Sequence, residues 1–163
     1  MLAKKILGIP LVLFRNAAGK ATTLLDRCAH LNVPLSLGRM SGPYLECGYH
    51  GWRYDSEGIC REVPALCKNK EAFARRVQAF PTQEQQGFVW VFPSSEPPTG
   101  QPFQIQHFDD ARYTRVHYQC DFEASLYSTL ENILDVPHTA FLHRGLFRGM
   151  SRPSTSVSRG PKG

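Results

Sequence analysis

The 163-residue sequence lacks an apolar run long enough to cross a bilayer. Its most apolar early segment, residues 6–14, follows two lysines as the core of a signal peptide would. Gly8 and Pro10 interrupt this segment, Arg15 ends it, and no convincing cleavage site follows. We therefore expect neither secretion nor a membrane anchor, and we interpret the segment as a buried strand.

The sequence also lacks a paired set of cysteines. Five cysteines without a signal peptide argue against a disulfide framework and for a reducing, cytoplasmic compartment. No basic–aromatic stripe or nucleic-acid motif is present, so nucleic acid is not an expected partner. The net charge of +5 is modest. It indicates either a basic patch that receives an acidic protein or, more simply, scattered solvated lysines and arginines.

Short β segments separated by turns predict a small, mainly β domain of antiparallel sheets over residues 1–93. Turn residues separate successive segments, and an apolar run at 87–92 predicts a fully buried last strand. The expected strands are 9–14, 21–25, 44–46, 52–54, 59–61, 75–80 and 87–92.

A Pro-rich segment, 94–108, is the expected linker to a second domain. Beyond it, residues 113–121 alternate like a strand, and residues 122–143 carry apolar side chains near helical spacing, with a break expected at Pro137. We assign 109–147 to the start of this second domain. The tail 148–163 is rich in Arg, Ser, Gly and Pro, and we expect it to be disordered.

Two Cys-His pairs are the main chemical feature of the first domain. Cys28 and His30 are followed, after sixteen residues, by Cys47 and His50. This mixed ligand set suits a tetrahedral zinc ion or a [2Fe–2S] cluster whose ligands divide between two irons. Each arm supplies one thiolate and one imidazole, whereas zinc modules usually pair like ligands in each arm. Glycines flank the second pair, as expected where backbone approaches a cluster closely.

The Pro-Leu-Ser run at 34–36 and the Gly-Tyr-His-Gly-Trp run at 48–52 extend this motif. Together they resemble the Rieske iron–sulfur domain, most closely that of the Rieske non-haem iron oxygenases. The resemblance implies that Cys28 and Cys47 ligate one iron and that His30 and His50 ligate the other. Respiratory and photosynthetic Rieske proteins carry an extra cysteine in each loop, and its absence here points to the soluble, lower-potential branch. The remaining cysteines are then most simply small buried hydrophobic residues: Cys60, Cys67 and Cys120.

A second constellation lies at 131–143, where Asp135 and His138 are three residues apart and His143 follows Pro137. Two imidazoles and a carboxylate form the facial triad of mononuclear Fe(II) oxygenases, although histidines and an aspartate on a helix are more often exposed or capping residues. The run resembles the Asn-x-x-Asp-x-x-His-x₄-His signature of Rieske oxygenases, with Asn132 at its start. The resemblance implies that His138 and His143 bind iron. It also implies that Asp135 bridges an iron-ligating histidine to a Rieske histidine, matching His50, of the neighbouring protomer.

The chain departs from that family at both ends. In the family the third iron ligand is an acidic residue far downstream, yet no Asp or Glu follows His143. A further strand expected before Lys4 is also missing. The chain therefore looks truncated, and apolar residues meant for a catalytic-domain core are expected to cause association: Phe141, Leu142, Leu146 and Phe147.

The resemblance thus implies the electron-transfer domain of an oxygenase, followed by the first strand and helix of an incomplete α+β helix-grip catalytic domain. The intact enzyme takes electrons from a reductase or ferredoxin. It forms a homotrimer and uses O₂ at a mononuclear iron to hydroxylate or demethylate an aromatic or other hydrophobic substrate. This chain is expected to hold the cluster but not to turn over alone. A stand-alone Rieske electron carrier and a structural zinc domain are the alternatives.

Overall fold

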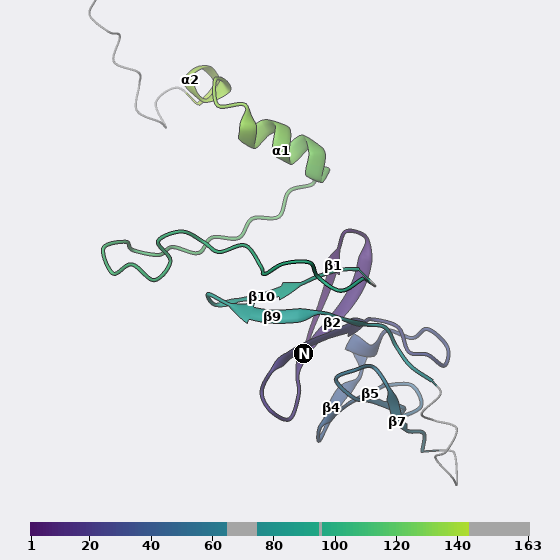
Figure 1. Ribbon diagram of the computed structural model, residues 1–163. Coiled ribbons are helices and arrows are strands. Elements are labelled where there is room, and N and C mark those ends of the chain that lie inside the picture. The colour runs from purple at the N-terminus through teal and green to yellow at the C-terminus, as the bar shows by residue number, and fades with distance from the viewer. Residues whose placement is uncertain (65–74, 95, 144–163) are drawn as a thin grey trace, which may run out of the picture. The chain divides into compact units, whose positions relative to one another are not determined.

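The computed structural model describes residues 1–64, 75–94 and 96–143. It is mainly β, with small antiparallel sheets and two short helices, as predicted. The chain forms two compact units, Met1–Thr114 and Arg115–Gly163. The first unit carries all the sheets (Figure 1).

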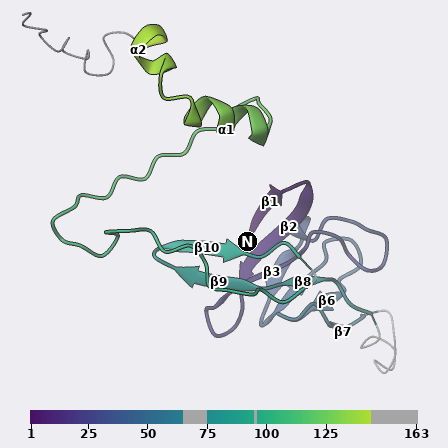
Figure 2. The same ribbon diagram turned by 45° about the horizontal axis from the view of Figure 1, so that its top comes forward.

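One four-stranded antiparallel sheet has the order β1-β2-β3-β8 (Figure 2). Its strands are β1 (Leu2–Ile6), β2 (Ile9–Arg15), β3 (Ala21–Leu25) and β8 (Ala79–Phe80).

The predicted strand at 9–14 is confirmed as β2, which pairs with β3 and is partly buried. The apolar segment 6–14 is not one continuous strand, however. Leu7 and Gly8, at φ values of 48° and 82°, form a two-residue reverse turn that splits the apolar segment. The chain therefore makes a β1–β2 hairpin, and mostly exposed β1 includes Lys4. β1 was not among the expected strands, and it begins before Lys4, where a strand was expected to be missing.

A second four-stranded antiparallel sheet, of order β4-β5-β6-β7, follows the 3₁₀ turn η1 (Leu35–Leu37). It comprises β4 (Arg39–Ser41), β5 (Tyr44–Glu46), β6 (Arg53–Tyr54) and β7 (Cys60–Glu62). The turn between β6 and β7 occurs where the sequence predicted it. The Asp55 carboxylate accepts hydrogen bonds from the backbone N–H groups of Glu57 and Ile59 there.

One hydrophobic core joins the two four-stranded sheets. Leu24 of the first sheet and Leu45 and Tyr54 of the second have no exposed surface. Burial of each such side chain stabilises the fold by about 1.5–3 kcal/mol. Cys28 and Cys47 belong to the same core, so both predicted thiol ligands are held by close packing.

A separate hairpin consists of β9 (Thr82–Gln85) and β10 (Phe88–Val91). The prediction that the last strand is fully buried is wrong, because Phe88 and Val89 are 37% and 40% exposed. β10 pairs with β9 alone, and no described strand pairs with its other edge. The apolar run at 87–92 therefore predicted a strand but did not predict how much of that strand is buried.

The second unit contains α1 (Leu126–Leu134) and α2 (His138–Leu142). The Ser125 hydroxyl caps α1 by accepting from the Ser128 N–H. The helices are interrupted before Pro137, as predicted. The predicted strand at 113–121 is wrong. These residues alternate between apolar and polar side chains, but they pair with no described strand.

The other cysteines do not share one environment. Cys60 is buried, as predicted, whereas Cys120 is exposed and the prediction for it was wrong. Cys67, the loop around it and the tail 148–163 lie outside the described residues. Of the helices described, none has the length and apolar character needed to cross a membrane.

Candidate metal centre

The first ligand loop, 26–33, follows β3 and closes on itself. The Cys28 N–H donates to the Val33 carbonyl at 2.8 Å, and the Asn32 N–H donates to the Cys28 carbonyl at 2.9 Å. Asn32 adopts a left-handed conformation with φ of 57°, which asparagine tolerates better than most residues. As a result Cys28 is buried at the base of the loop, and His30 is exposed near its tip.

The second ligand loop, 47–52, connects β5 to β6 and repeats this arrangement. The Cys47 N–H donates to the Trp52 carbonyl at 2.8 Å, and the Gly51 N–H donates to the Cys47 carbonyl at 3.0 Å. Cys47 is buried and His50 is exposed. Each loop therefore presents a thiol on the inside and an imidazole on the outside.

The two exposed histidines meet across the loops. Their Nδ1 atoms are 3.1 Å apart and their ring centroids are 4.8 Å apart. Two nitrogens that bind one metal ion with bonds of about 2 Å lie roughly 3 Å apart. The Nδ1 pair of His30 and His50 therefore fits two ligands of a single iron.

The buried thiols form the other pair. Burial raises the pKa of the Cys28 thiol above its ordinary value, a hydrogen bond to Tyr54 opposes this rise, and the neighbouring Cys47 thiol adds to it. The buried Cys28 thiol therefore resists ionisation, and a bound metal is the natural means of holding it as a thiolate.

Tyr54 is a site residue that the sequence reasoning missed. Its hydroxyl lies 3.1 Å from Cys28 Sγ and accepts the Ala29 N–H at 3.1 Å. Burial raises the pKa of Tyr54, so the hydroxyl keeps its proton and is the donor when Cys28 is a thiolate. The available signal was the inward-facing tyrosine two residues after Trp52 in a half-buried strand.

The four side chains suit two metal ions better than one. Across the described ranges, no three His, Cys, Asp or Glu side chains surround a common ion position. A structural zinc site needs four ligands around one point, whereas a [2Fe–2S] cluster of the Rieske type takes a sulfur pair on one iron and a nitrogen pair on the other. The residues present therefore fit the cluster.

Glycines in this region allow two backbone segments to meet. A Cβ at Gly38 would lie 1.9 Å from the Glu46 carbonyl oxygen, and one at Gly48 would lie 2.8 Å from the Leu37 carbonyl oxygen. Gly48 was expected to allow close approach of a cluster. Its immediate neighbour is instead the η1 backbone, so its described role is to pack that turn against the second loop.

Asp26 braces the first loop from outside the ligand set, and the sequence reasoning did not single it out. Its buried carboxylate accepts the Ser36 N–H at 2.7 Å and the Ser36 hydroxyl at 2.6 Å. This links the start of the loop to η1. The Pro-Leu-Ser run is thus a support for the ligand loop.

In the second unit the structure also brings the predicted residues near one another. The His138 and His143 ring centroids are 5.4 Å apart, comparable with the roughly 5 Å expected for two imidazoles on one ion. Asp135 ends α1, and its carboxylate lies 3.6 Å from His138 Nδ1. The same nitrogen contacts the Asp135 carbonyl, so the other ring nitrogen, Nε2, is the one that can bind a metal ion.

Comparison with known proteins identifies the domain that contains the two ligand loops. The Rieske [2Fe–2S] domain matches residues 1–81, which include both Cys-His pairs. The chain belongs to the Rieske family. The [2Fe–2S] cluster is accordingly the cofactor of this fold.

Similarity to Rieske-type oxygenases extends well beyond residue 81. Methylxanthine N1-demethylase NdmA of Pseudomonas putida is 34% identical over 149 residues, covering 88% of this chain and 41% of that protein. Chlorophyllide a oxygenase of Arabidopsis thaliana is 31% identical over 146 residues, covering 89% of this chain and 26% of that protein. Among solved structures, dicamba monooxygenase bound to dicamba matches with a TM-score of 0.76 at 28% identity, covering 88% of this chain and 43% of that one.

The Rieske chain is therefore much shorter than its relatives. It spans about a quarter to two-fifths of the length of the curated oxygenases just named. Their names establish oxidoreductase chemistry at the level of the family.

Proposed function

We propose that this chain is the electron-transfer portion of a Rieske-type oxygenase. Cys28 and Cys47 hold one iron of the [2Fe–2S] cluster, and His30 and His50 hold the other. The observation that carries this assignment is the separation of the ligands into a buried thiol pair and an exposed imidazole pair with nitrogens 3.1 Å apart. Replacing two thiolates by neutral imidazoles raises the potential above that of an all-cysteine cluster.

The second unit contributes ligands to a mononuclear iron. His138 and His143 supply two imidazoles, and the Asp135 carboxylate orients His138. When bound, that iron supplies O₂ activation. The third, carboxylate ligand does not come from the sequence after His143, which has no acidic residue.

The wider assignment follows the relatives. A reductase or ferredoxin supplies the electrons, and the substrate of the whole enzyme is a small aromatic or other hydrophobic molecule that is hydroxylated or demethylated. A homotrimer places Asp135 of one protomer beside His50 of the next, and the compartment is the cytoplasm. The names of the related demethylases support the oxidative reaction class.

A stand-alone Rieske electron carrier is the second candidate, because Met1–Thr114 contains both ligand loops and its own core. A carrier needs no second metal site. The proximity of Asp135, His138 and His143 therefore favours the oxygenase.

Anaerobic reconstitution of the full chain with iron and sulfide tests the proposal. We expect two irons and two sulfides per chain and, after reduction, an EPR spectrum with an average g value below that of an all-cysteine ferredoxin. Stoichiometric zinc without sulfide, or an all-cysteine type of spectrum, contradicts the assignment. Firmly bound iron beyond the two cluster atoms contradicts the claim that the second site is incomplete.

Ligand substitution sharpens this test. His50→Cys retains a cluster but lowers its potential, because a thiolate replaces a neutral imidazole. Cys120→Ser is the matched control, since Cys120 is exposed and outside both loops, and it leaves the potential unchanged. An unchanged potential in the His50→Cys protein argues against a ligand role for His50.

A further inference from the structure

The first loop has an aromatic connection to the surface that the ligand assignment does not use. The buried Trp52 indole stacks on the His30 ring, with centroids 4.7 Å apart and planes 6° from parallel. The guanidinium of exposed Arg75 lies over the same indole, 4.7 Å from its centroid. A surface cation, a buried aromatic ring and a proposed iron ligand therefore form an unbroken series of contacts.

We infer that an acidic one-electron donor protein docks over Arg75 and passes its electron to the cluster through Trp52 and His30. The inference rests on the proposed function, because it requires the cluster at His30. It adds to that function a docking position, the charge of the partner and a route.

The charges around the ligand loops support an acidic partner. The acidic side chains of the β4–β7 sheet are largely neutralised: Glu46 pairs with Arg39 and Arg53, and Asp55 pairs with Arg61. By contrast, no described carboxylate forms an ion pair with Arg27 or Arg75.

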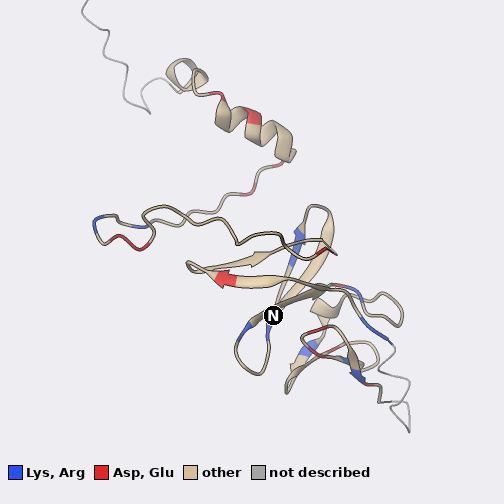
Figure 3. Ribbon diagram, viewed as in Figure 1, with Lys and Arg blue, Asp and Glu red and all other residues tan. Residues whose placement is uncertain are grey.

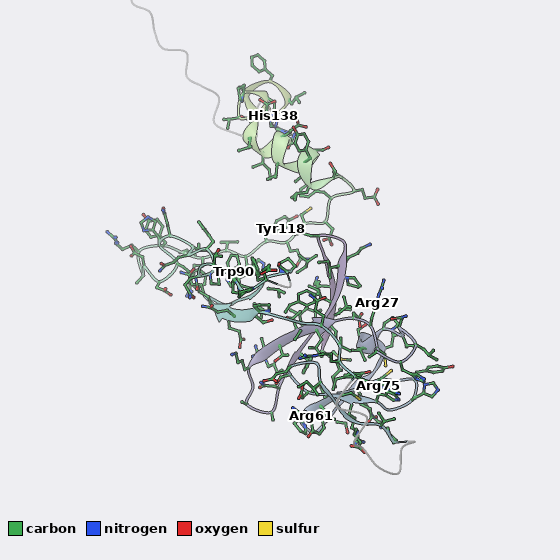
Figure 4. All side chains as sticks on the ribbon, turned by 45° about the vertical axis from the view of Figure 1, so that its right-hand side comes forward. Arg27, Arg61, Arg75, Trp90, Tyr118 and His138 are labelled. Atoms are coloured by element: carbon green, nitrogen blue, oxygen red, sulfur yellow. The ribbon has the colours of Figure 1, made fainter. Side chains whose placement is uncertain are left out.

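The two arginines are also well placed. Arg27 directly precedes Cys28, and Figure 4 shows Arg27 and Arg75 on the same side of the unit. Figure 3 shows that basic and acidic segments are interspersed in the first unit. Two cations that pair with no carboxylate of the described residues, near a redox centre, attract and orient an acidic surface.

The surface beside the histidines has the composition of a docking interface. Leu31, the residue after His30 in the first loop, is 56% exposed, and Leu37 in η1 is 72% exposed. Apolar side chains with charged residues at the edge are typical of specific but transient contacts. Delivery through His30 also leaves the His50 edge free for onward transfer.

The step is a simple outer-sphere transfer. The reduced donor, a [2Fe–2S] ferredoxin or a flavoprotein domain, loses one electron, and one ferric ion of the cluster is reduced to ferrous. No covalent bond forms or breaks. Close ring contacts favour the route because electron-transfer rates fall steeply with the gap between groups.

Stopped-flow reduction of the reconstituted full chain tests the inference, with reduced plant-type [2Fe–2S] ferredoxin as the acidic probe. We expect the double variant Arg27→Gln, Arg75→Gln to lower the second-order rate about three- to tenfold at low salt, with a weaker salt dependence than the parent chain. Reduction by reduced methyl viologen, a small cation, should not fall. The single variant Arg75→Lys, in which Arg27 is unchanged, keeps the positive charge at position 75. It should therefore retain most of the parent ferredoxin rate.

Lys20→Gln is the matched control. It removes one positive charge, as each arginine substitution does, from the turn before β3, about 17 Å along the strand from the first loop, and it should leave both rates unchanged. Equal ferredoxin rates and salt slopes in the parent and double-variant proteins overturn the inference. An equal loss with Lys20→Gln also overturns it, because net charge then explains the effect. Failure of the parent chain to take up a cluster is a different outcome, which contradicts the proposed function itself.

Discussion

At the scale of single residues, Cys28 shows how the fold prepares a ligand. Its thiol lies in the core, where burial is the main cause of its raised pKa, and the Tyr54 hydroxyl contacts its sulfur. The same hydroxyl accepts the Ala29 N–H and is thereby held in one place. Tyr54 therefore acts as a positioning residue that adjusts the electronic environment of the sulfur.

Tyr54→Phe removes this hydrogen bond with little change in packing volume. Because hydrogen bonds to a ligand sulfur stabilise the reduced, more negative cluster, we expect a lower reduction potential with iron and sulfide content unchanged. Protein-film voltammetry of the two reconstituted proteins measures the difference. A potential equal to that of the parent chain would show that the hydroxyl has no influence on the cluster.

Gly38 is the second residue whose identity the packing requires. Gly38→Ala should destabilise the first unit by about 2–4 kcal/mol, because the added Cβ collides with the Glu46 carbonyl and neither backbone segment moves freely. Urea unfolding measures the loss. Gly100→Ala, where nothing lies within 4 Å of the added Cβ, is the control and should be nearly neutral.

At the scale of elements, the two ligand loops have the same pattern of backbone hydrogen bonds around their cysteines. Each is closed by hydrogen bonds from and to its cysteine backbone, and each extends from a strand of a different sheet. The common core between those sheets sets the distance between the loops. The separation of the two histidines is thus a property of sheet packing.

The β9–β10 hairpin is attached to the first sheet by Glu84. Its carboxylate accepts hydrogen bonds from Arg15 at 2.8 Å and from the Ala21 N–H at 3.3 Å. The Arg15 guanidinium, and then the Ala21 N–H, hold the pKa of Glu84 below its ordinary value. The ionised carboxylate is therefore favoured in the folded state.

This shift predicts a pH dependence. A lowered folded-state pKa gives stabilisation that is present above the unfolded pKa of Glu84 and is lost as the pH falls through the folded pKa. Glu84→Gln should therefore lower Tm slightly at neutral pH and have less effect in acid. Thermal unfolding at several pH values from neutral to acidic measures the difference between the two proteins. An offset in Tm that is the same at every pH would contradict the role assigned to the ionised carboxylate.

At the scale of the whole molecule, the two units differ in how they bury apolar surface. The first has a shared core, whereas no residue of α1 or α2 is buried in the described structure. Leu126, Leu130, Ile133 and Leu134 follow helical spacing and are 46–77% exposed. Phe141 and Leu142 are exposed as well, while Leu146 and Phe147 lie outside the described residues.

The exposed apolar face of α1 predicts self-association of the chain. Leu130→Glu together with Leu134→Lys should shift the protein towards monomer, because the face then becomes costly to bury. Sedimentation velocity over a range of concentrations measures this. Ser128→Glu combined with Glu131→Lys, a pair of charge changes at non-apolar positions of the same helix, is the control. If association does not change in the Leu130 and Leu134 variant, this helix is not the contact surface.

The local sequence predicted much of this protein. Turn residues and β-rich segments predicted the β2–β3 and β6–β7 hairpins, and Pro137 predicted the interruption of the helices. These features depend on backbone preferences within a few residues. The ligand motif identified the family for the same reason, since its spacing is carried by two short loops. The burial of β10 and the strand at 113–121 were predicted wrongly, because burial and pairing depend on partners elsewhere in the chain.

The contacts that shape the site were decided by tertiary structure. Tyr54 reaches Cys28 across 26 positions, the Nδ1 atoms of His30 and His50 meet across 20, and Arg75 lies over Trp52 from a distant segment. No local pattern encodes such distances, because they follow from how two sheets pack around one core. The sequence thus determined which groups are available for chemistry, and the packing decided which of them touch.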